Sequence, residues 1–355
     1  SFAGCQFYNV WQPGGVTQAA ANSMAGVSFD KTDTEMEVFN AFATGDLGFG
    51  FPSAGGSNIF AVLGLESRRE FFNTVSDSDS AAGNFAGAGA AAPPVRGETE
   101  VNEFFMEGLI PVYAGDGVFK SFDVDVGYRY SDYDRSGGAN TYKIGFTADI
   151  GMFRPRGGYN RAIRAPGIND LFAQQRTILF GGADPCAGAT PTFSAAQCAN
   201  TGVSADQYGR VPANPAQQNN QFVGGNPNLT PEEADTYTIG VVFSPFDDLA
   251  IAVDYYDIQI KDTISAIGAN TILNFCATTG DPFLCDRINR NPQSGDIWRD
   301  PAFYVVNLTD NFGELSSKGI DLNVNYMFEA LGGRFATSFV GNYILEEETN
   351  PLPGV

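Results

Sequence analysis

The chain has 355 residues and a formal net charge of −21. This excess of acid excludes nucleic acid as a partner, because a polyanion requires a basic surface. The 42 glycines, 30 phenylalanines and 14 tyrosines favour a turn-rich, all-β architecture over a helical bundle. The sequence contains no run of about 18 or more apolar residues, so it predicts no transmembrane helix. A transmembrane β-barrel stays possible, because its apolar residues alternate with polar ones.

Histidine is absent from the sequence, and no CxxC pair occurs among the five cysteines. Histidine-based catalysis and an ordinary zinc site are therefore excluded, and we expect no enzymatic activity, metal or cofactor. Cys186 with Cys198, and Cys276 with Cys285, lie in polar, Gly/Pro/Asn-rich stretches that suit small disulfide loops in an oxidising compartment. Cys5 is left over, and its simplest partner is a cysteine upstream of Ser1.

The first part of the chain predicts a short helix around 17–24 and then a hairpin with strands at 34–47 and 57–71. Residues 73–97 are a low-complexity run of Ser, Asp, Ala and Gly that cannot bury enough apolar surface to pack by itself, so we expect a surface loop.

Alternation is clearest in 119–133, where Phe122, Val124 and Val126 interleave with Asp123 and Asp125. Further strands are expected at 100–113, 141–150, 154–164, 236–243, 249–261, 318–328 and 334–345. In 249–261 the apolar phase slips after Tyr255, which predicts a bulge or the point where the strand leaves the membrane. Residues 269–276 predict helical turns within a long loop.

Together these segments give about ten strands whose connections alternate between tight turns at one end and mostly longer loops at the other, at about 73–97, 165–231 and 262–315. This asymmetry is typical of an antiparallel transmembrane β-barrel with short periplasmic turns and long extracellular loops. Ten strands alone would leave two open edges, so we expect a segment of a larger barrel, and barrels of about 22 strands with a plugged lumen form the transporter class.

Two motifs carry a family resemblance. The run Asn226-Pro-Asn-Leu-Thr-Pro-Glu232 and the run from Tyr159 to Pro166, Tyr-Asn-Arg-Ala-Ile-Arg-Ala-Pro, are similar to the segments where a long outer loop of TonB-dependent outer-membrane receptors enters and leaves the barrel. The resemblance implies that residues 1–355 are a partial receptor β-barrel domain without the plug domain.

The resemblance also implies a function. It predicts energised uptake of a scarce ligand, of the siderophore-iron, cobalamin or oligosaccharide class, across the outer membrane of a Gram-negative bacterium. The implied partners are outer-membrane lipid, the small-molecule or oligosaccharide ligand, and TonB acting through the plug region.

Arg161 and Arg164, near the expected outer rim, are the candidate ligand-binding residues, because a guanidinium can hold a carboxylate or phosphate in a bidentate manner. The competing interpretation for both is a salt bridge to loop acids. Two other functions stay open at this point. One is a passive outer-membrane porin or channel, and the other is a secreted β-sandwich binding domain.

Overall fold

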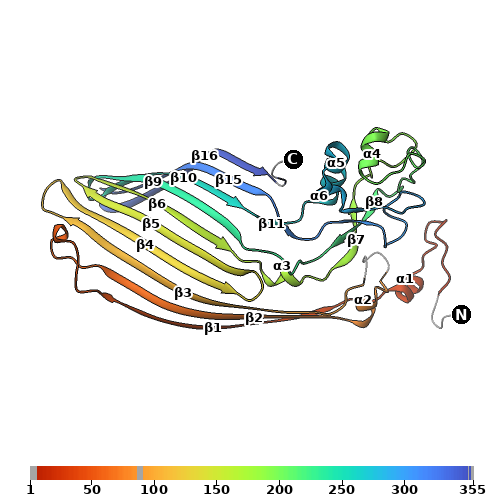
Figure 1. The fold of residues 1–355 in the computed structure, drawn as a ribbon, viewed down its shortest axis with the longest axis horizontal. Coiled ribbons are helices and arrows are strands. Elements are labelled where there is room, and N and C mark those ends of the chain that lie inside the picture. Colours follow the sequence, from red (N-terminus) through yellow and green to blue (C-terminus); the bar gives the residue numbers. More distant parts are fainter. Residues whose placement is uncertain (1–5, 86–90, 351, 353–355) are drawn as a thin grey trace.

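The computed structural model describes residues 6–85, 91–350 and 352, so Cys5 lies outside the described residues. Its main element is one antiparallel sheet of ten strands, in the order β1-β2-β3-β4-β5-β6-β9-β10-β15-β16 (Figure 1). The expected all-β fold and the number of long strands are confirmed. β1 and β16 form the two edges of this sheet in the described part of the chain.

β4 and β10 have the bounds that the sequence predicted, and the other eight strands are longer. The bounds of the ten strands are β1 Asp30–Asp46, β2 Phe60–Ser76, β3 Val95–Ala114, β4 Phe119–Tyr133, β5 Gly137–Ile150, β6 Phe153–Arg164, β9 Glu232–Phe246, β10 Leu249–Lys261, β15 Glu314–Ala330 and β16 Gly333–Asn350. β2 and β3 extend a few residues into the expected loop at 73–97, because cross-strand hydrogen bonds continue to the pair Thr74 and Val95.

The two ends of the sheet differ. At one end, called here the turn end, the connections 115–118, 151–152, 247–248 and 331–332 are short, and only 47–59 is longer, with the 3-10 helix η1 at Pro52–Ala54. At the opposite end, called the loop end, residues 77–94, 165–231 and 262–313 connect the strands, and only 134–136 is short. The expected alternation of tight turns and long loops is therefore present.

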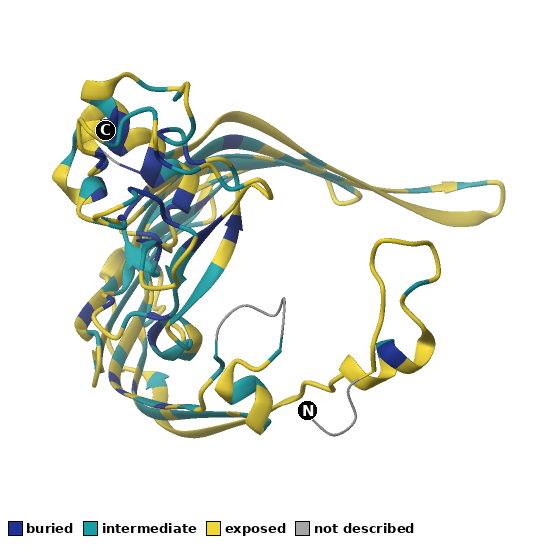
Figure 2. Ribbon diagram, turned by 90° about the vertical axis from the view of Figure 1, so that its right-hand side faces the viewer, coloured by how far each residue is buried: buried dark blue, intermediate teal, exposed yellow. Residues whose placement is uncertain are grey.

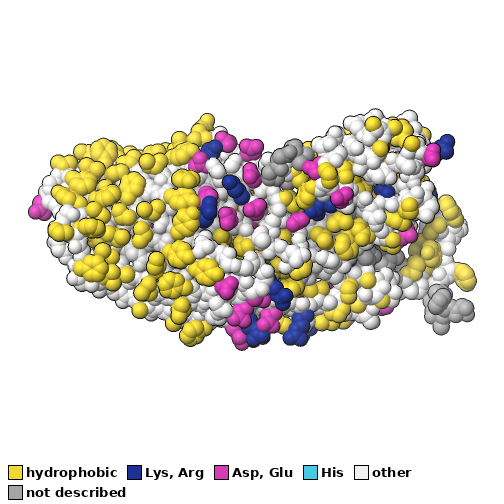
Figure 3. Space-filling model, in the orientation of Figure 1, with side chains coloured by type: hydrophobic (Ala, Val, Ile, Leu, Met, Phe, Trp, Pro, Cys, Tyr) yellow, Lys and Arg dark blue, Asp and Glu magenta, His cyan; other side chains and the backbone are white. Residues whose placement is uncertain are grey.

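The sheet is curved, and its two faces differ in chemistry. Viewed from the loop end it forms an open arc (Figure 2). Residues paired directly across antiparallel strands share a face, so the registers assign each side chain to the convex or the concave face. On the convex face, hydrophobic side chains cover the turn-end half, and a band of acidic and basic side chains separates them from the loops (Figure 3).

The concave face is rich in ion pairs, such as Arg129 with Glu103 and Arg156 with Asp254. β1 departs from this pattern, because the exposed Met36 and Val38 are paired with Glu70 and Arg68 and so lie on the concave face.

The long loops contain structure of their own. The chain also forms the helices α1 Gln18–Met24, α2 Ser78–Ala82, α3 Ile168–Phe172, α4 Ala195–Asn200, α5 Ala269–Thr279 and α6 Pro282–Cys285, and the short strands β7 Arg176–Gly181, β8 Gln218–Val223, β11 Ile264–Ser265, β12 Ile288–Asn289, β13 Tyr304–Val306 and β14 Asp310–Asn311. A small sheet, β12-β13-β8-β7, joins loop 165–231 to loop 262–313, with β13 parallel to β8.

For the phase slip in β10 the sequence predicted either a bulge or the point where the strand leaves the membrane, and the structure has no bulge at that position. The register of β10 against β15 runs without a shift from Leu249 to Lys261, and the irregularity against β9 falls at Leu249 and Ile251. Tyr256, Ile258 and Ile260 are therefore apolar residues of the concave face in a regular strand. No helix in the described ranges is long and apolar enough to cross a membrane.

Candidate functional site

The loops 165–231 and 262–313 pack into one body at the loop end, called here the loop module. Disulfides join Cys186 to Cys198 and Cys276 to Cys285, which are the two pairs that the sequence suggested. Ile272, Leu273, Leu284, Ile297 and Val305 form its main core, and all five are fully buried. A loop rich in Gly, Pro and Asn thus acquires a core that a simple surface loop would not have.

A buried ion pair links the two loops of the module. The Arg290 Nη1 atom lies 2.5 Å from Asp184 Oδ2, and both side chains are at most 4% exposed. Arg290 also donates to the carbonyl oxygens of Thr201 and Gly295, and Asp184 accepts the backbone N–H of Cys186. The charges are therefore paired and hydrogen-bonded on both sides, as buried charges require.

The segment around the Asn226–Glu232 motif, one of the two that resemble the receptor family, anchors the loop module at α3 above the sheet. The N–H groups of Gly225 and Asn226 donate to the carbonyl oxygens of Ala173 and Asp170, directly at α3. A Cβ atom at Gly225 would lie 2.7 Å from the Ala173 nitrogen and the Leu171 carbonyl carbon, so this close approach requires glycine. Leu229, 1% exposed, packs with Leu171 and Ile264 beneath it.

A cavity of about 490 Å³, called here the vestibule, lies between the α3 region of the loop module and the concave face of β2 and β3. All three long loops contribute to it. Its walls come from β2 (Phe72, Thr74 and Ser76), from the start of β3 (Val95), and from Asn169, Gln174, Arg176, Gly224, Asn307 and Thr309 of the loop module. Its volume lies within the range of about 300–1,000 Å³ that small-molecule sites occupy.

The vestibule lining is amide- and hydroxyl-rich and close to neutral. Asp30 and Arg176 are the charged residues that line it, and neither takes part in an ion pair within the part of the chain that the structure describes. Gln174 donates to the Pro93 carbonyl, which holds loop 77–94 against the loop module. In the described ranges, no three Cys, Asp or Glu side chains are grouped so that they could hold a metal ion.

Asp77 fixes the rim of the vestibule beside Ser76. Its carboxylate caps α2 by accepting the backbone N–H groups of Asp79 and Ser80, and it also accepts the Ser80 hydroxyl and the N–H of Phe29. These hydrogen bonds, led by the Ser80 hydroxyl, favour the charged form and lower the pKa of Asp77 to about 2. Asp77 thereby ties the start of β1 to the end of β2.

Arg161 lies on the convex face and does not line the vestibule. It shares the face of its cross-strand partner Tyr142, and its Nε and Nη2 atoms lie 2.9 and 2.7 Å from the two carboxylate oxygens of Asp235. Tyr159 donates its hydroxyl to the same carboxylate.

Arg164 lies on the opposite, concave face, because it is three residues further along β6. Its Nε and Nη2 atoms lie 2.9 and 2.6 Å from the Glu232 carboxylate oxygens, and Nη1 lies 3.2 Å from Asp170 Oδ2. Glu232 also accepts the N–H of Ile264. Arg164 thus joins β6, α3, β9 and β11 at the base of the module. A ligand-binding role for either arginine stays a prediction.

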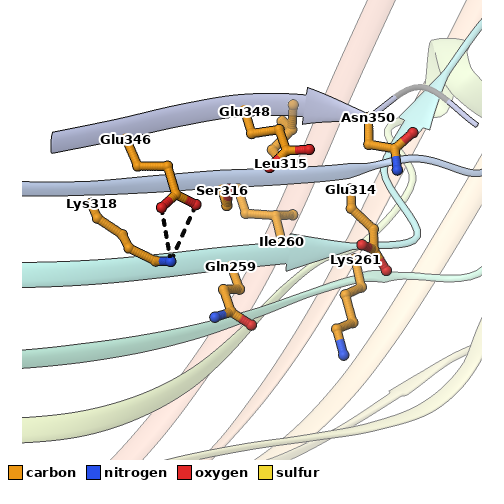
Figure 4. A pocket seen from close by; sticks show the side chains of 10 residues that line it. All are labelled: Gln259, Ile260, Lys261, Glu314, Leu315, Ser316, Lys318, Glu346, Glu348 and Asn350. Atoms are coloured by element: carbon orange, nitrogen blue, oxygen red, sulfur yellow. Dashed lines mark hydrogen bonds and ion pairs between the residues drawn. The ribbon is translucent and has the colours of Figure 1, made fainter. Parts of the chain in front are cut away.

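A second cavity, of about 210 Å³, lies on the convex face at the loop end of β10, β15 and β16. Figure 4 shows Lys318 of β15 with its ammonium directed at both carboxylate oxygens of Glu346 of β16, at 3.2 and 3.3 Å. Glu314, Glu348 and Lys261 extend this charged surface. Because it faces outward from the arc, it is separated from the vestibule by the sheet itself.

An antiparallel wall with an apolar convex face and a charged concave face defines part of a β-barrel. The family model for the TonB dependent receptor-like β-barrel matches residues 5–355. The chain therefore belongs to the TonB-dependent receptor β-barrel family, whose members are transport receptors with barrels in the outer membrane of Gram-negative bacteria. No curated protein matches the chain in sequence.

Solved structures of siderophore receptors share this fold. A variant of the ferric enterobactin receptor PfeA from Pseudomonas aeruginosa is 14% identical over 89% of this chain and 36% of its own, with a TM-score of 0.56. The siderophore receptor PirA from the same organism is 14% identical over 89% of this chain and 44% of its own, with a TM-score of 0.52. PirA from Acinetobacter baumannii is 16% identical over 89% and 37%, with a TM-score of 0.54. The chain thus spans well under half the length of these receptors.

Sequence reasoning did not find the vestibule. Its polar residues are single Asn, Gln and Thr side chains in loops, with no motif or spacing that marks them. One available signal was strand parity. Arg161 has the same parity as Tyr159, and Arg164 the same parity as Arg156, so alternation alone could have assigned the two arginines to opposite faces.

Proposed function

We propose that this chain is the central part of the barrel of an outer-membrane receptor that takes up a scarce ligand, energised by TonB through a plug region. The family match over residues 5–355 carries the proposal. In such a receptor the concave face lines the lumen, the loop module lies outside the cell, and the connections 77–94, 165–231 and 262–313 are the outer loops. The vestibule is then the part of the ligand entrance that this chain contributes.

The convex face supports the membrane location. A strand needs about 9–11 residues to cross the hydrocarbon layer, whereas β6 has 12 residues and β3 has 20. Along the convex face of β9, the apolar Val241 and Ile239 are followed by Tyr237 and then by Asp235 and Glu233. β10 repeats this order with Val253, Tyr255 and Asp257. A tyrosine between apolar and charged residues fits the boundary between acyl chains and headgroups, with outer-membrane lipid as the partner.

The first experiment tests membrane orientation. We would replace Cys5 and the partner cysteine expected upstream of it by Ser in the complete receptor, and place one spin label at Ile239→Cys or at Thr238→Cys. These neighbours in β9 lie on opposite faces, which makes each the control for the other. We expect the label at 239 to be relaxed mainly by oxygen dissolved in lipid, and the label at 238 mainly by a water-soluble nickel chelate. Equal access of both labels to the chelate would contradict a membrane barrel and favour a soluble β-domain.

The second experiment separates a receptor from a passive channel. The complete receptor, in lipid nanodiscs, is titrated with the soluble periplasmic part of TonB, and binding is followed by calorimetry. Saturable binding supports energised uptake. A protein that conducts ions in planar bilayers without binding TonB would instead be a porin.

A further inference from the structure

We infer that the vestibule takes an uncharged, polyhydroxylated ligand, that is, a sugar or neutral oligosaccharide. This inference rests on the proposed function and deepens it by naming the class of ligand. The vestibule offers two features that such a ligand uses, polar groups that both donate and accept hydrogen bonds, and apolar surface for the C–H faces of a sugar ring.

The charges of the concave face argue against a strongly anionic ligand. Apart from Arg334 at the turn end, whose guanidinium lies 3.9 Å from an Asp248 oxygen, the cations that the registers assign to this face are already held by carboxylates. These pairs are Arg68 with Glu66 and Glu70, Arg129 with Glu103, Lys143 with Glu107, Arg154 with Asp149, Arg156 with Asp254, and Arg164 with Glu232. An anion bound to one of them would have to displace a carboxylate and leave that acid beside it. The net charge of −21 adds a general repulsion.

Within the vestibule the balance is also near neutral. Arg176 supplies one positive charge and Asp30 one negative charge to the lining. A ligand with several negative charges would find a single guanidinium there, and a ligand with several positive charges a single carboxylate. Neither arrangement compensates the desolvation of a multiply charged ligand.

The uncharged polar side chains of the vestibule can bind the hydroxyl groups of a sugar. Asn169, Gln174, Asn307 and Thr309 contribute three amides and a hydroxyl to the lining. Gln174 and Thr309 already donate to the carbonyl oxygens of Pro93 and Gly224, and Asn307 donates to Gln221 and accepts the N–H of Gly268. Their remaining lone pairs and amide N–H groups, together with the whole amide of Asn169, can bind the hydroxyls of a sugar. The Asn169 side chain is exposed in the vestibule and has no hydrogen-bond partner within the described ranges, so it is free to bind ligand. Phe72, Val95 and Val223 supply the apolar part of the lining. A small number of placed polar groups on an apolar wall is the usual composition of a small-molecule site.

The test uses the complete receptor in lipid nanodiscs and an oligosaccharide array with neutral, sulfated and uronate members, with ferric enterobactin as a separate anionic probe. We expect neutral members to bind. Asn169→Ala should weaken that binding by about fivefold, through the loss of hydrogen bonds worth about 1 kcal/mol. Ala266→Phe should weaken binding further, because Ala266 lines the vestibule and is exposed, so a phenyl ring there occupies part of the cavity without entering the core.

Two matched controls define specificity. Asn73→Ala removes an asparagine from the convex face of β2, next to Thr74, and should leave binding unchanged. Arg69→Gln removes a cation from the same convex face of β2, outside the vestibule, and should also leave neutral binding unchanged.

Binding of sulfated sugars, uronates or ferric enterobactin alone, with loss in Arg176→Gln, would overturn the inference. So would the absence of binding by every neutral member, or neutral binding whose affinity is unchanged in Ala266→Phe. The TonB titration distinguishes the two levels, because a receptor that binds TonB but no neutral sugar refutes only the ligand class, whereas failure to bind TonB refutes the proposed function.

Discussion

The buried ion pair between Arg290 and Asp184 makes the loop module one cooperative body. Asp184→Ala leaves the guanidinium buried without its counter-ion. Removing one partner of such a pair costs about 3–5 kcal/mol. The pair joins loop 165–231 to loop 262–313, and Asn200 of α4 also donates to the Ala277 carbonyl of α5, at 3.0 Å. We therefore expect the free energy of local opening to fall in both loops together.

Hydrogen exchange with mass spectrometry on the complete receptor measures this directly. Amides of α4 and α5 should lose protection by more than about a hundredfold, since each 1.4 kcal/mol is about a factor of ten. Replacing both partners, with Asp184→Leu and Arg290→Met, should cost less than the single variant, because no unpaired charge is left. Lys31→Ala, which breaks the exposed pair with Asp33, is the control and should change stability by less than about 1 kcal/mol. A loss below about 1 kcal/mol in Asp184→Ala, or a response of one helix without the other, would refute a single cooperative module.

Three further predictions concern the base and rim of the module. The pKa of Asp77 is lowered from 3.8 to about 2, so its contribution to the rim is fully present above pH 3.8 and is lost as the pH falls towards 2. Amide exchange at Phe29 and Ser80, corrected for intrinsic rates, should rise over that window, and Asp77→Asn should remove the pH dependence. Gly225→Ala should destabilise the contact between residue 225 and α3 by about 1–3 kcal/mol through overpacking. Gly181→Ala is the control, because position 181 has open space for a Cβ atom. Equal unfolding curves for the two variants would disprove the close approach of Gly225 to the α3 backbone. Arg161→Gln, on the convex face, should leave ligand affinity unchanged. Arg164→Gln should weaken ligand affinity several-fold, because it loosens the base of the loop module. Loss of affinity in Arg161→Gln alone would mean that the ligand binds on the convex face of the sheet.

The two candidate arginines of β6 lie on different surfaces of the sheet because of their positions along the strand. Arg161 and Arg164 resemble each other in sequence and in their bidentate carboxylate partners, yet they lie on opposite faces of β6. The first is next to Tyr142 and Tyr159 on the surface proposed to face lipid. The second is at the junction of four elements below the vestibule. The interpretation of both as salt bridges to acids agrees with the geometry, and the acids belong mainly to β9 rather than to flexible loops.

The long strands were predictable because their signal is local. Alternation of Phe122, Val124 and Val126 with Asp123 and Asp125 specifies two faces from consecutive residues alone, and Gly-rich turns such as 151–152 separate one strand from the next. The two disulfide pairs were predictable for a similar reason, since each joins cysteines separated by 12 or 9 positions in a polar stretch. The motif from Asn226 to Glu232 marks the point where the long loop returns to the sheet. β9 begins at Glu232, and the N–H of Asn226 donates to the Asp170 carbonyl of α3.

The loop module and the vestibule were decided by tertiary structure. Val305 of β13 pairs in parallel with Gln221 of β8, and Arg290 meets Asp184, contacts between distant residues that no periodicity encodes. β11, β12 and β14 have two residues each, too few for a recognisable pattern. The vestibule exists only where β2, β3 and three loops converge. The sequence by itself determined which side chains share a face of the sheet, because a strand repeats every two residues. Only the packed structure decided which distant loops meet above that sheet, because those contacts depend on burial and hydrogen bonding between segments far apart in the chain.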